Sequence, residues 1–480
     1  MRIRSVYLSL GALICFLLLC FGVYNIYFYY QEKPEVGQSL PEISFVPGQT
    51  RLLVIAPHCD DETLGCGGII QEVVGAGGEV MVVAMTNGDG FTFAAEEQFH
   101  HLFLTQDDYI KSGYLRQNEF IWALQRLGVA QNRIIFLGYP DRGLGSIWAE
   151  HWDSNSPYQS RYTGKAYSPY SNSYRLNTPY SGKAVMDDLE SIIRKFKPSL
   201  IFLPHPDDEH IDHAATWAFT SAVVIKVANN GILQIPRLYT YLVHRGGFPI
   251  PHGYRPEAAL LPPKPMYQKN SWQWEQFTLT SDQESVKEAA LNEYVSQLRV
   301  PIMSKLLRSF IRRNELFEQV DIPLIVPRTS AVNLADATAW ETQKPELVYP
   351  KTVSALGALE HKARVRALAC AVQDSSLWLH FYIPDFSMYF NQYQVSVIGF
   401  RENQNMLNRT RNIFSFSMIG ADVAPENIKR FNDAVIINVP FSEQGLPDYF
   451  FIRIQMKDRF GAMIDHTAWQ PVKIQHVANK

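Results

Sequence analysis

Cysteine is scarce in this chain, and its distribution does not indicate a disulfide framework. The chain has 480 residues and five cysteines, which are Cys15, Cys20, Cys59, Cys66 and Cys370. A disulfide scaffold needs an even set of cysteines at regular spacings in a short domain. The class of small, cross-linked extracellular proteins is therefore excluded.

Excess charge and a glycine-rich nucleotide loop are also lacking. The 44 basic and 47 acidic side chains give a net charge of -3. The chain therefore lacks the excess positive charge typical of nucleic-acid-binding proteins, and we expect no nucleic-acid partner. No G-x-G-x-x-G follows the first strand-like run, and the acids there would repel the pyrophosphate of a dinucleotide. The length and an apolar content of 46% indicate an ordinary globular protein with more than one domain.

A long apolar run lies near the N-terminus. Residues 6–23 carry no charge and are long enough to cross a bilayer. Arg2 and Arg4 precede the run, and aromatic residues follow it as they do at a membrane interface. A cleaved signal peptide is the alternative, but no small-residue cleavage site follows. We expect a single-pass anchor with a cytoplasmic N-terminus and an extracytoplasmic catalytic domain, in the periplasm, outside the cell or in a secretory lumen.

Two strand-like runs end in histidine and acidic residues. Residues 52–56 lead into Pro57-His58-Cys59-Asp60-Asp61-Glu62, and residues 200–203 lead into Pro204-His205-Pro206-Asp207-Asp208-Glu209-His210-Ile211-Asp212-His213. Ligands of open α/β sheets bind at the carboxyl ends of strands, and crowded acids repel unless a cation relieves them. The pair therefore predicts a metal site assembled across a sheet. A polar turn with a helix cap is the alternative for the first run alone.

These runs resemble the two signatures of the PIG-L/LmbE family of metal-dependent de-N-acetylases. The first signature, (A/P)-H-P-D-D-E, is similar to residues 57–62, with Cys59 in place of the usual Pro and expected as an apolar filler. The second, H-x-D-H, matches residues 210–213. Residues 204–209 spell the first signature more literally but stand in the wrong place. We read Asp207, Asp208 and Glu209 as loop acids, with a place in the pocket wall left open for Asp208.

The resemblance covers Glu42 to Val320 and implies a zinc hydrolase that acts on an N-acetylated amino sugar. His58, Asp61 and His213 would hold one Zn²⁺ and leave a position open for water. The expected substrate is a glycolipid or an envelope glycan. The alternatives are an amidase for a non-sugar substrate and a catalytically idle glycan-binding or scaffold protein on the same fold.

Catalytic roles follow from the same resemblance. Asp60 would be the general base, His210 would stabilise the oxyanion as a charged donor, and Asp212 would orient a histidine. Glu62 is expected as a residue of the helix start or as a support for the site rather than a ligand.

Two further residues are candidate substrate contacts. Arg116 lies one helical turn from Glu119, so the two form either a surface ion pair or an R-x-x-E in which Arg116 points to the substrate. Asp141 lies in a G-x-x-D turn. Either its side chain forms a hydrogen bond with a sugar hydroxyl, or it is a turn residue that needs no ligand. The tyrosine-rich stretch 151–181 is either a lid over the pocket or a solvated insertion.

The predicted fold is α/β, with a Rossmann-like, mostly parallel sheet flanked by helices. A terminal helix is expected over Ser304–Phe317 and a last strand over Phe277–Thr280. Short alternating runs from Pro327 onward predict an antiparallel β-sandwich-like domain. The expected divisions are a transmembrane anchor at 1–30, a linker at 31–48, a deacetylase domain at 49–322 and a β-rich accessory domain at 323–480.

Overall fold

The computed structural model describes most of the chain from residue 39 onward. The described residues are 39–99, 103–229, 235–267, 273–327, 332–340, 351–352, 365, 367–383, 392–403, 406–417, 426–431, 433–441, 445–458 and 460–475. The expected anchor at 1–30 lies outside them. Within these ranges, no helix combines the length and apolar character needed to cross a membrane.

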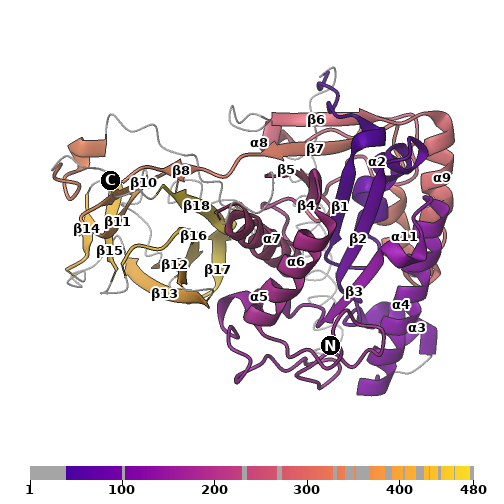
Figure 1. Cartoon of the computed structure of the whole chain (residues 1–480), viewed down its shortest axis with the longest axis horizontal. Coiled ribbons are helices and arrows are strands. Elements are labelled where there is room, and N and C mark those ends of the chain that lie inside the picture. Colours follow the sequence, from indigo (N-terminus) through magenta and orange to yellow (C-terminus); the bar gives the residue numbers. More distant parts are fainter. Residues whose placement is uncertain are drawn as a thin grey trace, which may run out of the picture.

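The centre of the N-terminal region is a mostly parallel sheet, as predicted. Among the described residues it has seven strands in the order β3-β2-β1-β4-β5-β7-β6 (Figure 1). The first five strands of this order pair in parallel, and β7 runs antiparallel to both of its neighbours. The strands are β1 (Arg51–Ala56), β2 (Glu79–Thr86), β3 (Ile134–Tyr139), β4 (Leu200–Pro204), β5 (Arg237–Tyr241), β6 (Gln273–Thr278) and β7 (Asn314–Val320).

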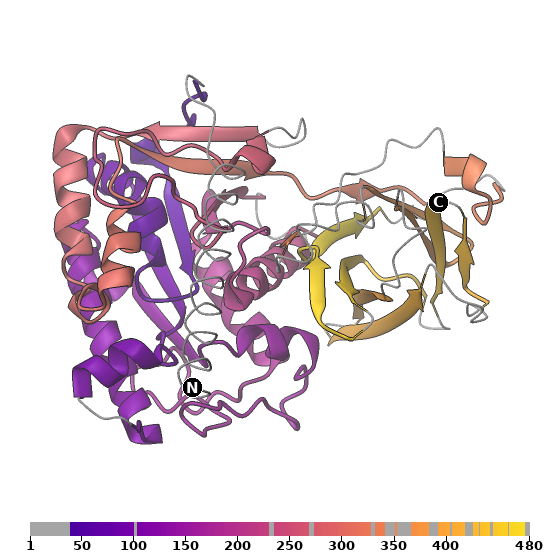
Figure 2. The ribbon, with the colours of Figure 1, turned by 180° about the vertical axis from the view of Figure 1, so that it is seen from behind.

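Both faces of this sheet are covered by helices (Figures 1 and 2). Alternate residues of β1 point to opposite sides, so Leu52 and Val54 enter one apolar core while Leu53 and Ile55 enter another. The first core includes α2 (Asp61–Gly75), α4 (Gln106–Arg126), α9 (Ser281–Leu291) and α11 (Pro301–Arg308). The second includes α5 (Leu144–Ala149), α6 (Gly182–Phe196) and α7 (Ile211–Asn229). Short helices complete the region: α3 (Thr92–Phe99), α8 (Lys264–Tyr267) and α10 (Val295–Leu298).

The register of β1 and β4 brings the two polar runs together. These strands are parallel neighbours, with Leu52 opposite Leu200 and Val54 opposite Phe202. Their carboxyl ends therefore meet at one edge of the sheet. The loop before α2 and the loop before α7 follow directly from this edge.

The end of the N-terminal region differs from the expectation. The helix predicted over Ser304–Phe317 is confirmed only as far as Arg308, where α11 ends, and it is wrong beyond that point, because residues 314–320 form β7. This segment pairs with β5 on one side and β6 on the other, and its apolar residues Leu316 and Phe317 enter the core. Tertiary pairing therefore overrides the helical pattern of the sequence.

The C-terminal region consists of antiparallel sheets, as expected. In its described part, one sheet has the order β10-β11-β15-β14 and the other contains β13, β12, β16, β17 and β9. Off this path, β18 pairs with β16, and the short β8 pairs in parallel with β18. Apolar residues of both sheets share one core. The strands are β8 (Leu324–Ile325), β9 (Lys351–Thr352), β10 (Ala367–Gln373), β11 (Ser376–Tyr382), β12 (Gln392–Asn403), β13 (Met406–Ser417), β14 (Ile428–Arg430), β15 (Ala434–Pro440), β16 (Tyr449–Lys457), β17 (Met463–His466) and β18 (Gln470–Ile474).

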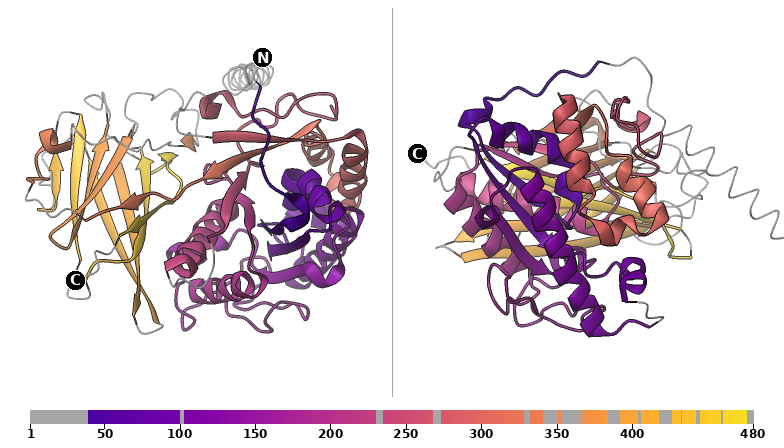
Figure 3. Two further views of the ribbon diagram at one scale, coloured as in Figure 1. Left: turned by 45° about the horizontal axis from the view of Figure 1, so that its top comes forward. Right: turned by 90° about the vertical axis from the view of Figure 1, so that its right-hand side faces the viewer.

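An aromatic seam joins the two regions on the side of α5 and α7 (Figures 1 and 3). The Trp217 indole N–H donates a 2.9 Å hydrogen bond to the carbonyl of Trp469. The Trp148 ring lies 5.6 Å from the Phe400 ring and 5.0 Å from the Phe451 ring, measured between centroids. The seam matters for the site because α7 carries Asp212 and His213 in its first turn.

The tyrosine-rich stretch is packed into the N-terminal region. Tyr170 and Tyr180 are buried, and the Tyr170 hydroxyl donates a 2.6 Å hydrogen bond to Asp89, which follows β2. The Tyr158 amide donates to the carbonyl of Tyr180 at 2.8 Å, which closes the stretch on itself. A solvated insertion is therefore wrong for Tyr170 and Tyr180, and a lid stays a prediction.

Candidate active site

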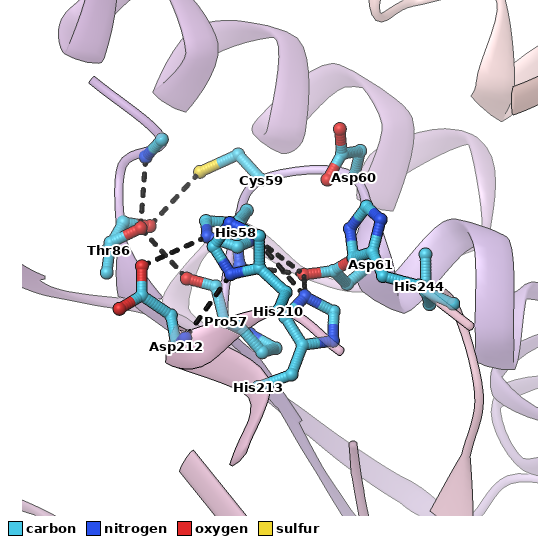
Figure 4. A network of polar contacts seen from close by, with 12 residues as sticks. Pro57, His58, Cys59, Asp60, Asp61, Thr86, His210, Asp212, His213 and His244 are labelled. Carbon is cyan, nitrogen blue, oxygen red and sulfur yellow. Dashed lines mark hydrogen bonds and ion pairs between the residues drawn. The ribbon is translucent and has the colours of Figure 1, made fainter. Parts of the chain in front are cut away.

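Three ligand-type atoms converge where β1 and β4 end (Figure 4). His58 Nδ1 lies 3.2 Å from Asp61 Oδ2 and 3.3 Å from His213 Nε2, and the latter two atoms are 3.2 Å apart. His58 and Asp61 follow β1, whereas His213 is in the first turn of α7. All three side chains are buried. The structure thus brings together the three metal ligands predicted from the sequence.

The size of this triangle suits a zinc ion. Ligand atoms placed tetrahedrally at zinc bond lengths are about 3.3 Å apart, and the three observed separations are 3.2 to 3.3 Å. Two imidazoles and one carboxylate form a donor set that zinc prefers. His58, Asp61 and His213 would therefore hold the metal.

Buried carboxylates orient both histidines. Asp212 Oδ2 lies 3.3 Å from His58 Nε2, and its Oδ1 accepts the Leu144 amide at 3.0 Å. Asp208 Oδ2 lies 3.0 Å from His213 Nδ1. Burial alone would lower the pKa of His213, but Asp208 and Asp61 outweigh it and raise this pKa to about 9. Each carboxylate faces the ring nitrogen that points away from the triangle, the usual arrangement behind ligand histidines.

The loop-acid interpretation of Asp208 is therefore wrong. The residue is fully buried, and besides His213 it accepts the amides of His210, Val243 and His244 at 3.0, 3.1 and 2.9 Å. Asp207 is buried as well, and the sequence does not indicate which of these acids contacts a ligand histidine. The histidine of the literal copy of the first signature does not join the triangle, because His205 Nε2 contacts Glu318 at 2.6 Å.

Asp60 is held beside the triangle by Arg116. The guanidinium of Arg116 donates to Asp60 Oδ2 at 3.0 Å and to the Gly88 carbonyl at 2.9 Å. Burial raises the pKa of the Asp60 carboxyl, and the positive charge of Arg116 opposes this rise. The surface-pair interpretation of Arg116 and Glu119 is wrong, because both are buried and Glu119 accepts the amide and hydroxyl of Ser296 at 2.7 Å.

His210 stands edge-on to His58, with ring centroids 4.5 Å apart. The Asp212 amide donates to His210 Nδ1 at 3.3 Å, so a neutral ring carries its proton on Nε2. Burial lowers the pKa of His210, and the nearby His58 and His213 lower it further. The role of His210 as a charged donor stays a prediction.

Asp141, the second candidate substrate contact, lies on the far side of His58. Its Oδ2 accepts the Gly90 amide at 2.9 Å, and its Oδ1 lies 3.4 Å from His58 Nε2. The side chain is buried. The structure therefore places Asp141 at the site rather than in an exposed turn.

Sequence reasoning missed His244, which follows β5. Its ring lies 4.8 Å from the His213 ring, measured between centroids. With His58, Asp61 and His213 it forms a group in which one ligand-type atom from each residue lies within 4.8 Å of the others. Burial lowers the pKa of His244 to about 4, and His213 also lowers it. The signal was available, because His244 stands after a predicted strand just as His58 does.

Comparisons with known proteins agree with the predicted family. Residues 53–224 match the family model described as "PIG-L: GlcNAc-PI de-N-acetylase". These residues form a PIG-L family domain. The domain contains the whole triangle, Asp60 and His210, whereas His244 lies beyond its last matched residue.

Relatives of the PIG-L domain include named deacetylases. A 1D-myo-inositol 2-acetamido-2-deoxy-alpha-D-glucopyranoside deacetylase from Mycobacterium sp. (strain KMS) is 32% identical over 215 residues, which cover 44% of this chain and 60% of that protein. The same-named protein of Kribbella flavida is 28% identical over 202 residues, covering 39% and 60%. The chain thus spans 60% of the length of these relatives.

Solved structures also resemble the chain. The N,N'-diacetylchitobiose deacetylase of Pyrococcus horikoshii has 20% identity and a TM-score of 0.35, covering 56% of this chain and 83% of that one.

Proposed function

We propose that this chain is a zinc-dependent deacetylase that removes the acetyl group from an N-acetylated amino sugar. The observation that carries the proposal is the triangle of His58, Asp61 and His213, whose edges of 3.2 to 3.3 Å suit one tetrahedral ion. The PIG-L match over residues 53–224 supports the same reaction.

The residues around the triangle have separate roles in amide hydrolysis. A bound zinc ion supplies an acidified water and polarises the acetamide carbonyl. Asp60 accepts the proton of the attacking water and returns it to the leaving amine. Arg116 fixes the direction of the Asp60 carboxylate, and burial makes that carboxylate more basic. His210 donates a hydrogen bond from its Nε2–H to the oxygen that becomes negatively charged in the tetrahedral state, and it keeps its proton.

Substitution of the base tests this function. We expect Asp60→Asn to retain about one equivalent of zinc while hydrolysis of the acetamide falls by about 10² to 10⁴-fold, because the base is lost and the triangle is intact. Metal analysis and acetate release from a panel of N-acetylhexosamine substrates measure both effects. Asp61→Asn is the matched control, and it should lose the metal. A metal-free wild-type protein, or full activity in Asp60→Asn, would refute the proposal.

The substrate is proposed to be an amino sugar on a glycolipid or an envelope glycan. Support comes from the names of the relatives, which are deacetylases of a 2-acetamido-2-deoxy-glucopyranoside. Comparing acetate release from N-acetylglucosamine conjugates and from N-acetyl amino acids decides between a sugar and a non-sugar amide. Faster release from the amino acids would contradict the sugar assignment.

We further propose that residues 1–30 anchor the protein in a membrane, with the N-terminus in the cytoplasm and the catalytic domain outside it. The support is the uncharged apolar run at residues 6–23 and the arginines before it. Protease added to intact cells or spheroplasts should digest the catalytic domain and release no N-terminal tag. Protection of the catalytic domain would refute the proposed orientation.

A further inference from the structure

A small hollow lies in the C-terminal region, outside the PIG-L domain and the metal triangle. It has a volume of about 130 Å³, and its described lining comes from β12, β13, the end of β15 and the segment before β16. Pockets that enclose a drug-sized ligand hold about 300–1,000 Å³. The hollow therefore suits one unit of a larger ligand rather than a whole molecule.

The strand register explains why polar side chains gather around this hollow. Val395 of β12 belongs to the apolar core between the two sheets. Gly399 and Arg401 follow on the same face of β12, since residues two apart on a strand share a face. Their partners on β13 are Thr410 and Asn408, respectively. The apolar core thus ends in a lining of polar side chains and glycine.

Two glycines keep the hollow open. A Cβ atom at Gly399 would lie 2.8 Å from Thr410 Oγ1 and 3.2 Å from Pro447 Cβ. A Cβ atom at Gly445 would lie 2.5 Å from an Arg401 guanidinium nitrogen, and the φ of +79° at Gly445 also disfavours any larger residue. The Arg401 guanidinium therefore packs against the backbone at Gly445, in the wall of the hollow.

The polar groups of this lining have hydrogen-bonding capacity that the described part of the protein does not use. Within the described ranges, the Arg401 guanidinium has no hydrogen-bond or ion-pair partner, and the side-chain amides of Asn408 and Asn412 have none either. The Thr410 hydroxyl has a long contact of 3.5 Å to the Gly399 carbonyl. No acidic side chain stands among the described residues that line the hollow. One uncompensated positive charge and three neutral polar groups thus line the same space.

We propose that the hollow binds an acidic sugar unit of a glycan, with the sugar carboxylate on Arg401. A guanidinium donates two parallel hydrogen bonds to a carboxylate, and the two groups carry equal and opposite charge. A phosphate group carries about −1.5 to −2 charges at pH 7, more than a single arginine neutralises. The lining therefore matches a carboxylate better than a phosphate.

The other lining residues suit the body of a sugar ring. Asn408 and Asn412 each offer amide donors and a carbonyl acceptor, and the Thr410 hydroxyl both donates and accepts, as ring hydroxyls require. Phe441 and Pro447 add apolar rings, on which the C–H groups of a sugar pack. A few polar groups that fix orientation beside an apolar surface are the usual composition of a ligand site.

The hollow is fixed relative to the catalytic domain. Phe400 stands between Gly399 and Arg401, so its side chain points to the opposite face of β12. There it packs on Trp148 of α5, with 5.6 Å between the ring centroids. A glycan held in the hollow stays attached to the enzyme while its acetamides are cleaved, which raises their effective concentration at the triangle. This role rests on the proposed function, whereas the binding of an acidic sugar does not.

Binding of tetragalacturonate by the purified full-length protein tests the inference. This probe carries carboxylates but no acetamide, so hydrolysis does not enter the measurement. We expect calorimetry to show saturable binding that weakens with added salt, and binding at least about tenfold weaker in Arg401→Gln, because a charge-assisted pair is lost. Arg411→Gln is the matched control and should bind as the wild type does, since Arg411 is exposed on the opposite face of β13.

A second variant and two further probes complete the test. Asn412→Ala should also weaken binding, and it replaces Arg401→Gln in the assay if thermal scans show that variant to be unfolded. Maltotetraose, a neutral oligosaccharide of the same length, should bind at least about tenfold more weakly than tetragalacturonate.

Several results would overturn this inference. They are an affinity unchanged in both variants, no saturable binding, equal binding of the two oligosaccharides, and tighter binding of inorganic phosphate than of galacturonate. Because zinc content and acetate release are measured separately, each of these results leaves the proposed function intact.

Discussion

Asp208 connects several parts of the site through one carboxylate. It faces the outer nitrogen of His213 and accepts the amides of His210, Val243 and His244. The loop after β4 and the end of β5 are thereby tied to the same ligand histidine. A single buried acid thus sets the positions of side chains from two strands.

His244 gives a prediction at the residue scale. One of its ring nitrogens and one ligand-type atom from each of His58, Asp61 and His213 lie within 4.8 Å of one another, so His244 is close enough to contact a metal held there or its bound water. We expect His244→Ala to lower zinc affinity by about tenfold or more, as losses around metal ligands do. Competition with a chelator measures this affinity. His252→Ala is the control, since His252 is exposed and bonds the Gly247 carbonyl. Equal affinity in wild type and His244→Ala would rule out this role.

The residues of the triangle and one of their supports, Asp212, were predictable from the sequence, whereas Asp208 and His244 were not. His58, Asp61 and His213 stand in two ordered motifs, each directly after a strand-like run. His244 follows the same rule but has no acidic neighbours that would mark it. Asp208 is one of three consecutive acids, of which Asp207 is buried as well, and only the fold decides which of them contacts His213. The sequence indicates side-chain chemistry at a strand end, whereas burial depends on contacts between distant segments.

At the scale of elements, α2 is fixed by a buried ion pair. Lys287 of α9 lies against Glu315 of β7, with 2.6 Å between Nζ and Oε1. Glu315 also accepts the amides of Gly68 and Ile69 at 2.6 and 2.9 Å. This cluster therefore joins α9 and β7 to the helix that begins with Asp61.

Breaking this pair should destabilise the fold. We expect Lys287→Met to lower the free energy of unfolding by about 3–5 kcal/mol, because Glu315 remains buried without its cation. Arg126→Ala, which removes an exposed partner of Glu293, should cost about 0–1 kcal/mol. Urea denaturation compares the two. Similar losses in both variants would contradict the assigned importance of the buried pair.

The elements themselves were predicted unequally well. The site residues follow β1 and β4. Both strands are continuous apolar runs, which are typical of buried parallel strands. The segment at 314–320 mixes acids with apolar residues, so its period did not distinguish a strand from a helix. The strand β13 was missed because polar residues such as Asn408, Arg409 and Asn412 interrupt any alternation.

At the scale of the whole molecule, the C-terminal sheets support the catalytic helices. Phe451 is fully buried and packs on Trp148 of α5. The loop into α5 supplies the Arg142 and Leu144 amides that orient Asp212. The accessory region thus contacts the helix that follows this loop.

Removal of one seam side chain tests this support. We expect Phe451→Ala to cost about 3–5 kcal/mol of stability, as large cavities do. Activity should also fall, because α5 and its preceding loop lose their packing partner. Thermal unfolding and acetate release measure the two effects. Ile413→Ala, at a 45% exposed position of β13, should change neither. An unaltered melting temperature in Phe451→Ala would show that the seam is not needed.

The seam of tryptophan and phenylalanine side chains has a consequence for genetics. Because α7 joins this seam and also carries His213, a selection for inactive mutants should recover hits in the last third of the polypeptide. Such hits would cluster around Phe400, Phe451 and Trp469, which contact no reacting group. Second-site suppressor mutations should then arise in α5 or α7, on the other side of the seam. Each pair of a mutation and its suppressor would identify two residues whose packing couples the C-terminal sheets to the active site.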